Sequence, residues 1–206
     1  EFFFIRGKKV IFEYDDAVYH NYGNHRLWLV RLFYSSKIKR LMKACSGVIC
    51  GNKFLEKYAQ KAGAKKIWVI PTVVDLAQYP DEIHRKNKEF TFVWIGTPYT
   101  VKFIRNIMNP LNELTSKYDF KLRLIGVSER IKEASFEIEY CNWEESTEFK
   151  LISECHVGIM PLNHTEWEKG KCGYKLIQYM ACGLPVIGEG IGANIDIIDE
   201  EFGFLA

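Results

Sequence analysis

Residues 170–187 combine a glycine-bearing loop, a helical pattern and a short apolar strand. Gly170 and Gly173 allow the backbone to turn tightly. The helical pattern over 174–181 places its apolar side chains at Leu176, Ile177, Met180 and Ala181. Gly183 then occupies the usual stop position of a helix, before an apolar strand over 185–187. The stretch therefore predicts a loop, a helix and a strand in direct succession.

The start of this helix is suited to an anion. A glycine-bearing loop that leads into a helix N-terminus brings unpaired N–H groups and the positive end of the helix dipole together. Lys171 and Lys175 add full positive charges at the same place. We therefore expect a phosphate group to bind here.

The rest of the chain alternates apolar, β-prone segments with helical patterns, which predicts an α/β fold with parallel sheets. Strands are expected over 8–14, 46–50, 67–71, 90–95, 121–127, 137–143, 157–162, 185–187 and 203–205. Helices are expected over 25–44, 53–62, 101–117, 147–155, 174–181 and 194–199.

Charge divides the chain into two halves. Residues 1–88 hold 17 Lys and Arg against 8 Asp and Glu, a balance of +9, whereas residues 89–206 hold 11 against 18, a balance of −7. A polar, charged linker over 80–88 joins the halves. The asymmetry indicates two domains with different partners, although ordinary surface scatter gives the same counts. No apolar run reaches the length of a membrane span.

Metal binding is not expected. The six cysteines form no CxxC and no His-Cys pattern, so we interpret them as reduced, buried thiols of a cytoplasmic protein. Asp15 and Asp16 end the first expected strand, where paired carboxylates could hold a metal ion. No third acidic residue lies nearby, so the preferred interpretation is that they cap the segment that follows.

The expected helix over 25–44 is amphipathic and basic. Its apolar stripe is formed by Leu27, Val30, Tyr34, Ile38 and Leu41, and six Lys and Arg side chains crowd the rest. Such a helix can lie on an anionic membrane surface, or it can simply present a solvated basic face. Both interpretations remain open, because one face can pack on the core while the other meets lipid headgroups.

Residues 179–186, Tyr-Met-Ala-Cys-Gly-Leu-Pro-Val, resemble the end of the donor-site motif of group 1 retaining glycosyltransferases. Residues 167–181 fit a subgroup pattern, W-x-x-G-K-x-G-x-K-L-x-Q-Y-M-A. The two glutamates of the usual E-x7-E pattern are replaced by Gly170 and Gln178. Residues 71–75, Pro-Thr-Val-Val-Asp, resemble the turn that leads to the interdomain linker of this family.

The resemblance covers about residues 8–206 and implies the GT-B architecture, in which two Rossmann-like domains with parallel sheets face each other. Residues 1–88 would then be a partial N-terminal, acceptor-side domain with its linker. Residues 89–206 would be the C-terminal domain that binds a nucleotide sugar. The family has further strands before the first domain segment and a further helix after the second, so the chain resembles a fragment.

The resemblance also implies a donor site. Lys175, with Lys171, would act as the catalytic pair that stabilises the departing diphosphate, beside backbone N–H groups of Gly173 and Tyr174. Gln178 could hydrogen-bond ribose hydroxyls in place of the usual carboxylate. The remaining donor-binding candidates are Gly96 and Thr97 at the diphosphate, Trp143 at the base, and His164, Glu166 and Asn194 near the sugar. Glu166 and Glu168 flank the loop, and either could replace the missing first glutamate of the family pattern.

The function implied is transfer of a sugar, with retention, from a nucleotide sugar to a glycan, lipid-linked or other acceptor in cell-surface polysaccharide biosynthesis. The nucleotide sugar is a substrate, so neither a cofactor nor a metal is expected, and nucleic acid is not an expected partner. Two alternatives are a nucleotide-sugar epimerase of the same fold and a non-catalytic nucleotide-binding or scaffold domain. The expected location is the cytoplasm, with residues 25–44 at the inner face of the membrane.

Overall fold

The computed structural model describes residues 8–79 and 86–206, and these residues form two compact units. Unit 1 extends to Thr72 and includes His164–Gly173 and Ile191–Asp196. Unit 2 comprises Val73–Asn163, Tyr174–Gly190 and Ile197–Ala206. Two segments from the second half of the chain thus group with the first half. The boundary expected at residues 88 and 89 stays a prediction, because most of the expected linker lies outside the described residues.

Unit 2 is built on a sheet of six parallel strands in the order β6-β5-β4-β7-β8-β9. The strands are β4 (Thr91–Ile95), β5 (Lys121–Ile125), β6 (Glu137–Cys141), β7 (Val157–Met160), β8 (Val186–Gly188) and β9 (Gly203–Leu205). The chain starts at the centre, moves to one edge through β5 and β6, and then crosses to β7 on the other side of β4. This is the strand order of a Rossmann-like fold, whose ligands bind at the carboxyl ends where the order reverses.

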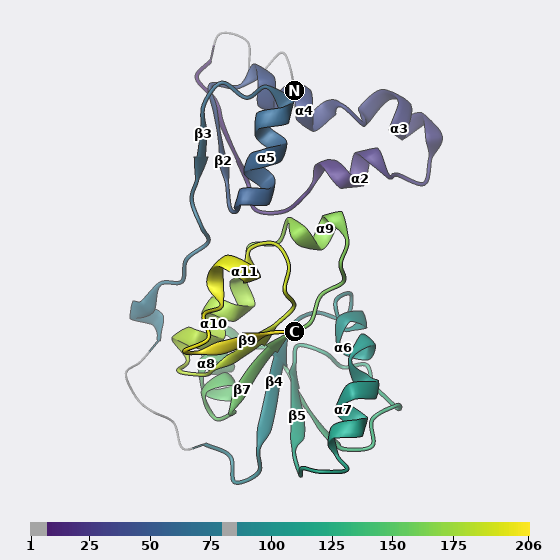
Figure 1. The fold of residues 1–206 in the computed structure, drawn as a ribbon, viewed down its shortest axis with the longest axis vertical. Coiled ribbons are helices and arrows are strands. Elements are labelled where there is room, and N and C mark those ends of the chain that lie inside the picture. Colours follow the sequence, from purple (N-terminus) through teal and green to yellow (C-terminus); the bar gives the residue numbers. More distant parts are fainter. Residues whose placement is uncertain (1–7, 80–85) are drawn as a thin grey trace. The chain divides into compact units, whose positions relative to one another are not determined.

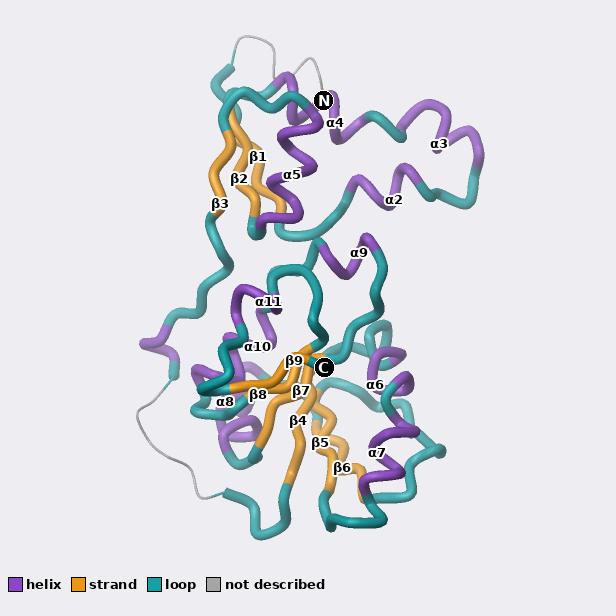
Figure 2. Tube along the Cα trace, in the orientation of Figure 1, coloured by secondary structure: helices purple, strands orange, loops and turns teal. Residues whose placement is uncertain are grey.

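Helices cover both faces of this sheet (Figures 1 and 2). The helices α6 (Lys102–Asn106) and α7 (Met108–Leu114) lie on one face, and α8 (Glu145–Ser153) and α10 (Tyr174–Ala181) lie on the other. All five residues of β4 are buried, as expected for the central strand of a sheet covered on both sides. The α/β fold with parallel sheets that the sequence predicted is therefore confirmed.

The single helix predicted over 101–117 is wrong, because the structure divides it at Ile107 into α6 and α7. Pro110 explains the break. Proline has no N–H group to donate to the carbonyl of Asn106, and its ring would clash with that carbonyl in a continuous helix. In the structure Pro110 instead lies in the first turn of α7, where no such bond is needed.

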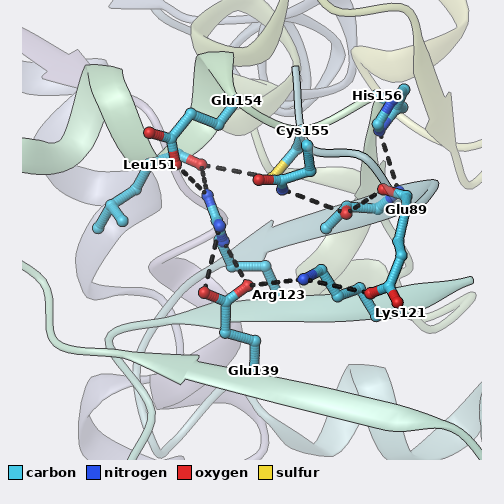
Figure 3. A network of polar contacts seen from close by, with 10 residues as sticks. Glu89, Lys121, Arg123, Glu139, Leu151, Glu154, Cys155 and His156 are labelled. Carbon is cyan, nitrogen blue, oxygen red and sulfur yellow. Dashed lines mark hydrogen bonds and ion pairs between the residues drawn. The ribbon is translucent and has the colours of Figure 1, made fainter. Parts of the chain in front are cut away.

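An ion network around the buried Arg123 side chain fixes the β6 edge of the sheet (Figure 3). The Arg123 side chain of β5 donates to both carboxylate oxygens of Glu139 on β6, at 2.9 and 3.2 Å. It also donates to Glu154 at 3.0 Å and to the Leu151 carbonyl of α8 at 2.7 Å. Burial alone would lower the pKa of Arg123, but the bonds to Glu139 and Glu154 outweigh it and raise that pKa. One side chain thus ties together two strands and a helix.

Unit 1 contains a sheet of three parallel strands in the order β1-β2-β3. The strands are β1 (Ile11–Tyr14), β2 (Gly47–Cys50) and β3 (Ile67–Val69). The helix α5 (Lys53–Ala62) packs against β2, β3 and α4 (Lys37–Ala44). Its N-cap is Asn52, whose side chain accepts from the Leu55 N–H at 2.9 Å, and its C-cap is Gly63, with φ of 80°.

The continuous helix predicted over 25–44 is also wrong. The structure has α3 (Trp28–Tyr34) and α4, separated at Ser35 and Ser36, and a further short helix, α2 (Tyr19–Gly23), precedes them. Serine side chains compete for backbone hydrogen bonds, which makes a serine pair a natural break. The two helices differ in burial, because α4 buries Ile38, Leu41 and Met42 whereas α3 buries none of its residues. No helix within the described residues is both long and apolar enough to cross a membrane.

Candidate functional site

The helix α10 begins at Tyr174, the residue where the sequence predicted its start. Gly173 precedes it with φ of 70°, a conformation that favours glycine. Lys175 lies in the first turn, and its Nζ atom is 5.8 Å from the centre of the Trp94 ring on β4. The indole of Trp94 is itself close to Gly96, so Lys175 lies near the carboxyl end of the central strand.

Tyr179 fixes α10 against that strand. Its side chain is fully buried, and its hydroxyl oxygen accepts from the Ile95 N–H at 3.0 Å. Burial raises the pKa of Tyr179 far above its usual range, which keeps the hydroxyl neutral. Gly158 on β7 makes room for the ring, because a Cβ atom there would lie 2.3 Å from Tyr179. The position of the helix start is therefore set by the core.

One turn after Lys175, Gln178 is buried and donates through Nε2 to the carboxylate of Glu148 on α8. The second oxygen of Glu148 accepts from the indole N–H of Trp143. Lys175 and Gln178 are three residues apart and therefore share one side of the helix. The structure thus joins two predicted site residues, Trp143 and Gln178, through a carboxylate that the sequence analysis did not select.

Gly96 and Thr97 form the turn after β4, as predicted. The Gly96 N–H donates to the Ile125 carbonyl at 3.0 Å, and the Thr97 N–H donates to the Thr100 hydroxyl at 3.0 Å. Gly126, which follows β5 with φ of 83°, approaches this turn closely. A Cβ atom on Gly126 would lie 2.4 Å from the Gly96 oxygen and 3.4 Å from the Cβ of Trp143. The carboxyl ends of β4, β5 and β6 therefore lie close together at these glycines.

A cavity of about 760 Å³ lies at the opposite end of the strands of the same sheet. Its lining includes Phe90, Tyr118, Phe120, Lys121 and Glu137, at the amino ends of β4, β5 and β6. Not one of the predicted site residues lines it. Ligands of open parallel sheets bind at the carboxyl ends, so we assign the candidate site to the end marked by Gly96, Gly126 and α10.

The loop over 170–172, with Lys171, lies in unit 1. The Nζ atom of Lys171 is 3.4 Å from the carboxylate of Asp16 and 5.8 Å from the centre of the Trp167 ring. The carboxylate of Asp16, which follows β1, therefore helps to hold this loop in place. The capping predicted for Asp15 and Asp16 is not found at the N-cap of α2, because that position is Val18 and has no side-chain hydrogen bond.

Further bonds fix the same loop within unit 1. Asn52 donates to the carbonyls of Gly170 and Lys171, at 2.9 and 3.0 Å, and the Cys172 thiol donates to the Asp15 carbonyl at 3.0 Å. Gly170 has φ of −76°, so the tight turn expected there does not need a glycine conformation. It needs space instead, because a Cβ atom on Gly170 would lie 2.6 Å from that of Ala17.

Glu166 and Glu168 lie on α9 (Glu166–Lys169) with different surroundings. Glu166 is exposed and pairs with Lys169 at 2.7 Å. Glu168 is buried and accepts from the Thr165 hydroxyl. His164 is exposed just before this helix, and Asn194 is buried at the start of α11 (Asn194–Ile197). The candidates expected near the sugar thus belong to unit 1, as do Lys171 and Gly173, whereas the other candidates expected near the nucleotide belong to unit 2.

Glu148 and Gly126 are the residues that the sequence analysis missed. Glu148 lies thirty positions before Gln178 in the chain, and no local pattern connects the two. Gly126 lies inside the strand predicted over 121–127, and the structure ends that strand at Ile125, so a glycine near the strand end was the available signal. Within residues 8–79 and 86–206 no group of three or more His, Cys, Asp and Glu side chains is placed to hold a metal ion.

Solved structures with similar folds include several glycosyltransferases. Sucrose-phosphate synthase from Thermosynechococcus elongatus matches with a TM-score of 0.67 and 16% identity, over 96% of this chain and 54% of that one. A mutant of S. aureus TarM, in complex with Fondaparinux, alpha-GlcNAc-glycerol and UDP, matches with a TM-score of 0.56 and 15% identity, over 90% and 38%. The apo lipopolysaccharide outer core galactosyltransferase WaaB matches with a TM-score of 0.57 and 14% identity, over 79% and 49%.

The chain spans about half or less of the length of these structures. At such identities they show the fold alone, and they agree with the GT-B architecture that the sequence resemblance implied. No curated protein sequence matches the chain significantly. The family described as glycosyl transferases group 1 matches residues 89–206, which is more than half of the chain. The protein therefore belongs to the group 1 glycosyl transferases, as its sequence motif predicted.

Proposed function

We propose that this protein transfers a sugar from a nucleotide sugar to a glycan, lipid-linked or other acceptor. The observation that carries the proposal is the place of Lys175. It lies in the first turn of α10, and α10 is held to the central strand by the bond between Tyr179 and Ile95. The start of a helix offers backbone N–H groups and the positive end of the helix dipole to an anion, and Lys175 adds a full charge.

Sugar transfer breaks the bond between the anomeric carbon and the diphosphate, so negative charge grows on the leaving oxygen. Positioned cations and dipoles lower the barrier by stabilising that charge. Lys175 is the main group for this role, assisted by backbone N–H groups of Gly173 and Tyr174. Lys171 is the second cation, and donor binding would replace its Asp16 partner with phosphate. This mechanism needs no metal ion.

The cluster of Trp143, Glu148 and Gln178 is proposed to bind the nucleoside. A ribose offers two hydroxyl groups that donate to a carboxylate, and the indole of Trp143 offers an exposed aromatic face to a base. Gln178 stands where the family pattern has a glutamate, and Glu148 brings a carboxylate to its amide. We therefore propose that Glu148 takes over the ribose contact.

The remaining predicted residues keep their proposed places around the donor. Gly96 and Thr97 would face the diphosphate, while His164, Glu166 and Asn194 would contact the sugar. We further propose that transfer proceeds with retention of anomeric configuration and serves cell-surface polysaccharide biosynthesis. All six cysteines are free thiols, which fits a reducing compartment such as the cytoplasm.

The proposal is tested by supplying the full-length protein with a panel of uridine, guanosine and adenosine diphosphate sugars. We expect nucleoside diphosphate to be released from one of them when an acceptor is present. The Lys175→Ala protein should lose this release. Lys117→Ala is the matched control, because Lys117 is an exposed lysine of the same unit away from the site. Release that is equal in both variants would contradict the proposal.

A second candidate is a non-catalytic nucleotide-binding or scaffold domain. It is favoured by Gly170 and Gln178, which stand at the two positions where the family pattern has glutamates. A protein of this kind would bind a nucleotide sugar and leave it intact. A nucleotide-sugar epimerase would instead convert the donor without an acceptor. Analysis of the product by NMR distinguishes transfer, epimerisation and simple binding, and it reports the anomeric configuration in the same experiment.

A further inference from the structure

The helix α3 is unusual because it is apolar on all sides and yet exposed. Its sequence, Trp-Leu-Val-Arg-Leu-Phe-Tyr, contains one charged residue, and none of its seven residues is buried. Large apolar side chains at Leu27, Trp28, Leu29, Leu32, Phe33 and Tyr34 are between 49% and 62% exposed. Single exposed apolar residues are normal, but a contiguous patch of this kind marks a contact surface.

The charges of the chain segment that contains this patch are all of one sign. Residues 17–55 contain no Asp or Glu, while residues 26–43 contain Arg26, Arg31, Lys37, Lys39, Arg40 and Lys43. Arg31 donates to the carbonyls of His25 and Arg26, at 2.7 and 3.4 Å, and Arg40 donates to the Phe33 carbonyl at 3.4 Å. Basic side chains therefore gather at both ends of α3. A complementary surface would be apolar where it meets the side chains of α3 and anionic where it meets the flanking basic side chains.

We propose that α3 inserts into the headgroup region of a membrane that carries anionic lipids. Phospholipid bilayers offer acyl chains to Leu32 and Phe33 and phosphate groups to the flanking basic residues. Trp28 and Tyr34 are the residue types that prefer the boundary between hydrocarbon and water. A second copy of the same face fits less well, because it would bring two basic patches together.

This inference changes the role expected from the sequence. A helix over 25–44 was expected to meet lipid through its basic face while its apolar stripe packed on the core. In unit 1 that division is made between two helices instead. The helix α4 packs on the core through Ile38, Leu41 and Met42, whereas the apolar side chains of α3 are not buried. The proposal stands independently of sugar transfer, since it concerns binding alone.

Flotation of the full-length protein with lipid vesicles tests the proposal. One set of vesicles contains phosphatidylcholine only, and the other contains phosphatidylcholine with about 30% phosphatidylglycerol, enough to give an anionic surface. We expect binding to the anionic vesicles that exceeds binding to neutral ones by about tenfold or more, and that weakens at high salt. Equal binding to both, or no binding to either, would overturn the proposal.

Two pairs of variants separate the apolar from the charged contribution. Trp28→Ser/Phe33→Ser should lower the vesicle partition coefficient by about tenfold or more, because two large apolar side chains no longer leave water. Its matched control, Tyr118→Ser/Phe204→Ser, changes two exposed aromatic residues of unit 2 and should bind as the unaltered protein does. Arg26→Gln/Lys39→Gln should reduce binding at low salt only, whereas Lys117→Gln/Lys132→Gln should not.

Brominated lipids report whether α3 itself enters the bilayer. They should quench the fluorescence of the protein, and Trp28→Phe should bind equally well but lose most of the quenching. Another segment of the protein and a second copy of the chain are the alternatives that could cover α3. If Trp28→Ser/Phe33→Ser lowers the melting temperature, or dissociates a dimer, while vesicle binding is unchanged, one of these occupants covers α3 and the proposal fails.

Discussion

The helices α10 and α3 have similar lengths and are both rich in apolar residues, but their surroundings differ completely. In α10, Leu176, Gln178 and Tyr179 are buried against unit 2, whereas α3 buries no residue in unit 1. The first is held by a six-stranded sheet, and the second follows a loop and a short helix. An apolar helical pattern thus predicts that the helix has a surface to bury. Whether the core of the same unit buries it depends on the tertiary structure.

The sharpest test of this difference uses one leucine from each helix. Leu176→Ala should lower the free energy of unfolding by about 3.5 kcal/mol, because Leu176 is fully buried and its removal leaves a cavity. Leu32→Ala should change it by less than about 0.5 kcal/mol, because Leu32 is 62% exposed. Urea titrations followed by circular dichroism measure both. Similar losses in the two variants would mean that α3 is covered in solution.

The next largest effect is expected from the lysine at the start of α10. Lys175→Ala should lower turnover by about a hundredfold, since removing a donor that stabilises the transition state costs on the order of 3 kcal/mol. The affinity for the nucleotide sugar should change much less, because the leaving charge grows only during the reaction. Lys175→Arg should recover part of the rate. Steady-state kinetics on protein with an unchanged melting temperature provide the measurement.

A smaller effect is expected at the cluster that joins α8 and α10. Glu148→Gln should weaken donor binding by about tenfold, or roughly 1.4 kcal/mol, because a neutral amide accepts ribose hydroxyl donors less strongly. Gln178→Ala should act in the same direction, with turnover at saturation less affected. Titration calorimetry with the nucleotide sugar measures both. The matched control is Glu145→Gln, an exposed change on the same helix that should leave the affinity unaltered.

The sequence predicted several helices of both units well because they follow local rules. The helix 174–181 was predicted with its actual bounds, since Gly173 and Gly183 mark its ends and both have positive φ values. The helix over 53–62 was predicted equally well, between Asn52 and Gly63. The two errors in helix length have local causes too, at Pro110 and at Ser35 with Ser36, but apolar periodicity continues across both breaks.

The contacts between distant segments could not be predicted. The carboxylate of Glu148 meets Gln178 only after the sheet has brought α8 and α10 together. The pairing of Asp16 with Lys171 joins residues 155 positions apart, and no pattern within either segment indicates it. Candidate site residues could be proposed where a loop leads into a helix, because that signal is local. Their partners depend on the fold.

The central claim is that the diphosphate of the donor lies at the start of α10, and a crystal structure of the full-length protein with a nucleoside diphosphate tests it most directly. The nucleotide would be the one whose sugar derivative is turned over in the panel. We expect its phosphates beside the N–H groups of the first turn of α10 and the Nζ atom of Lys175, with the ribose near Glu148. Phosphates bound instead in the cavity lined by Phe90, Tyr118 and Lys121, or elsewhere in the molecule, would contradict the account.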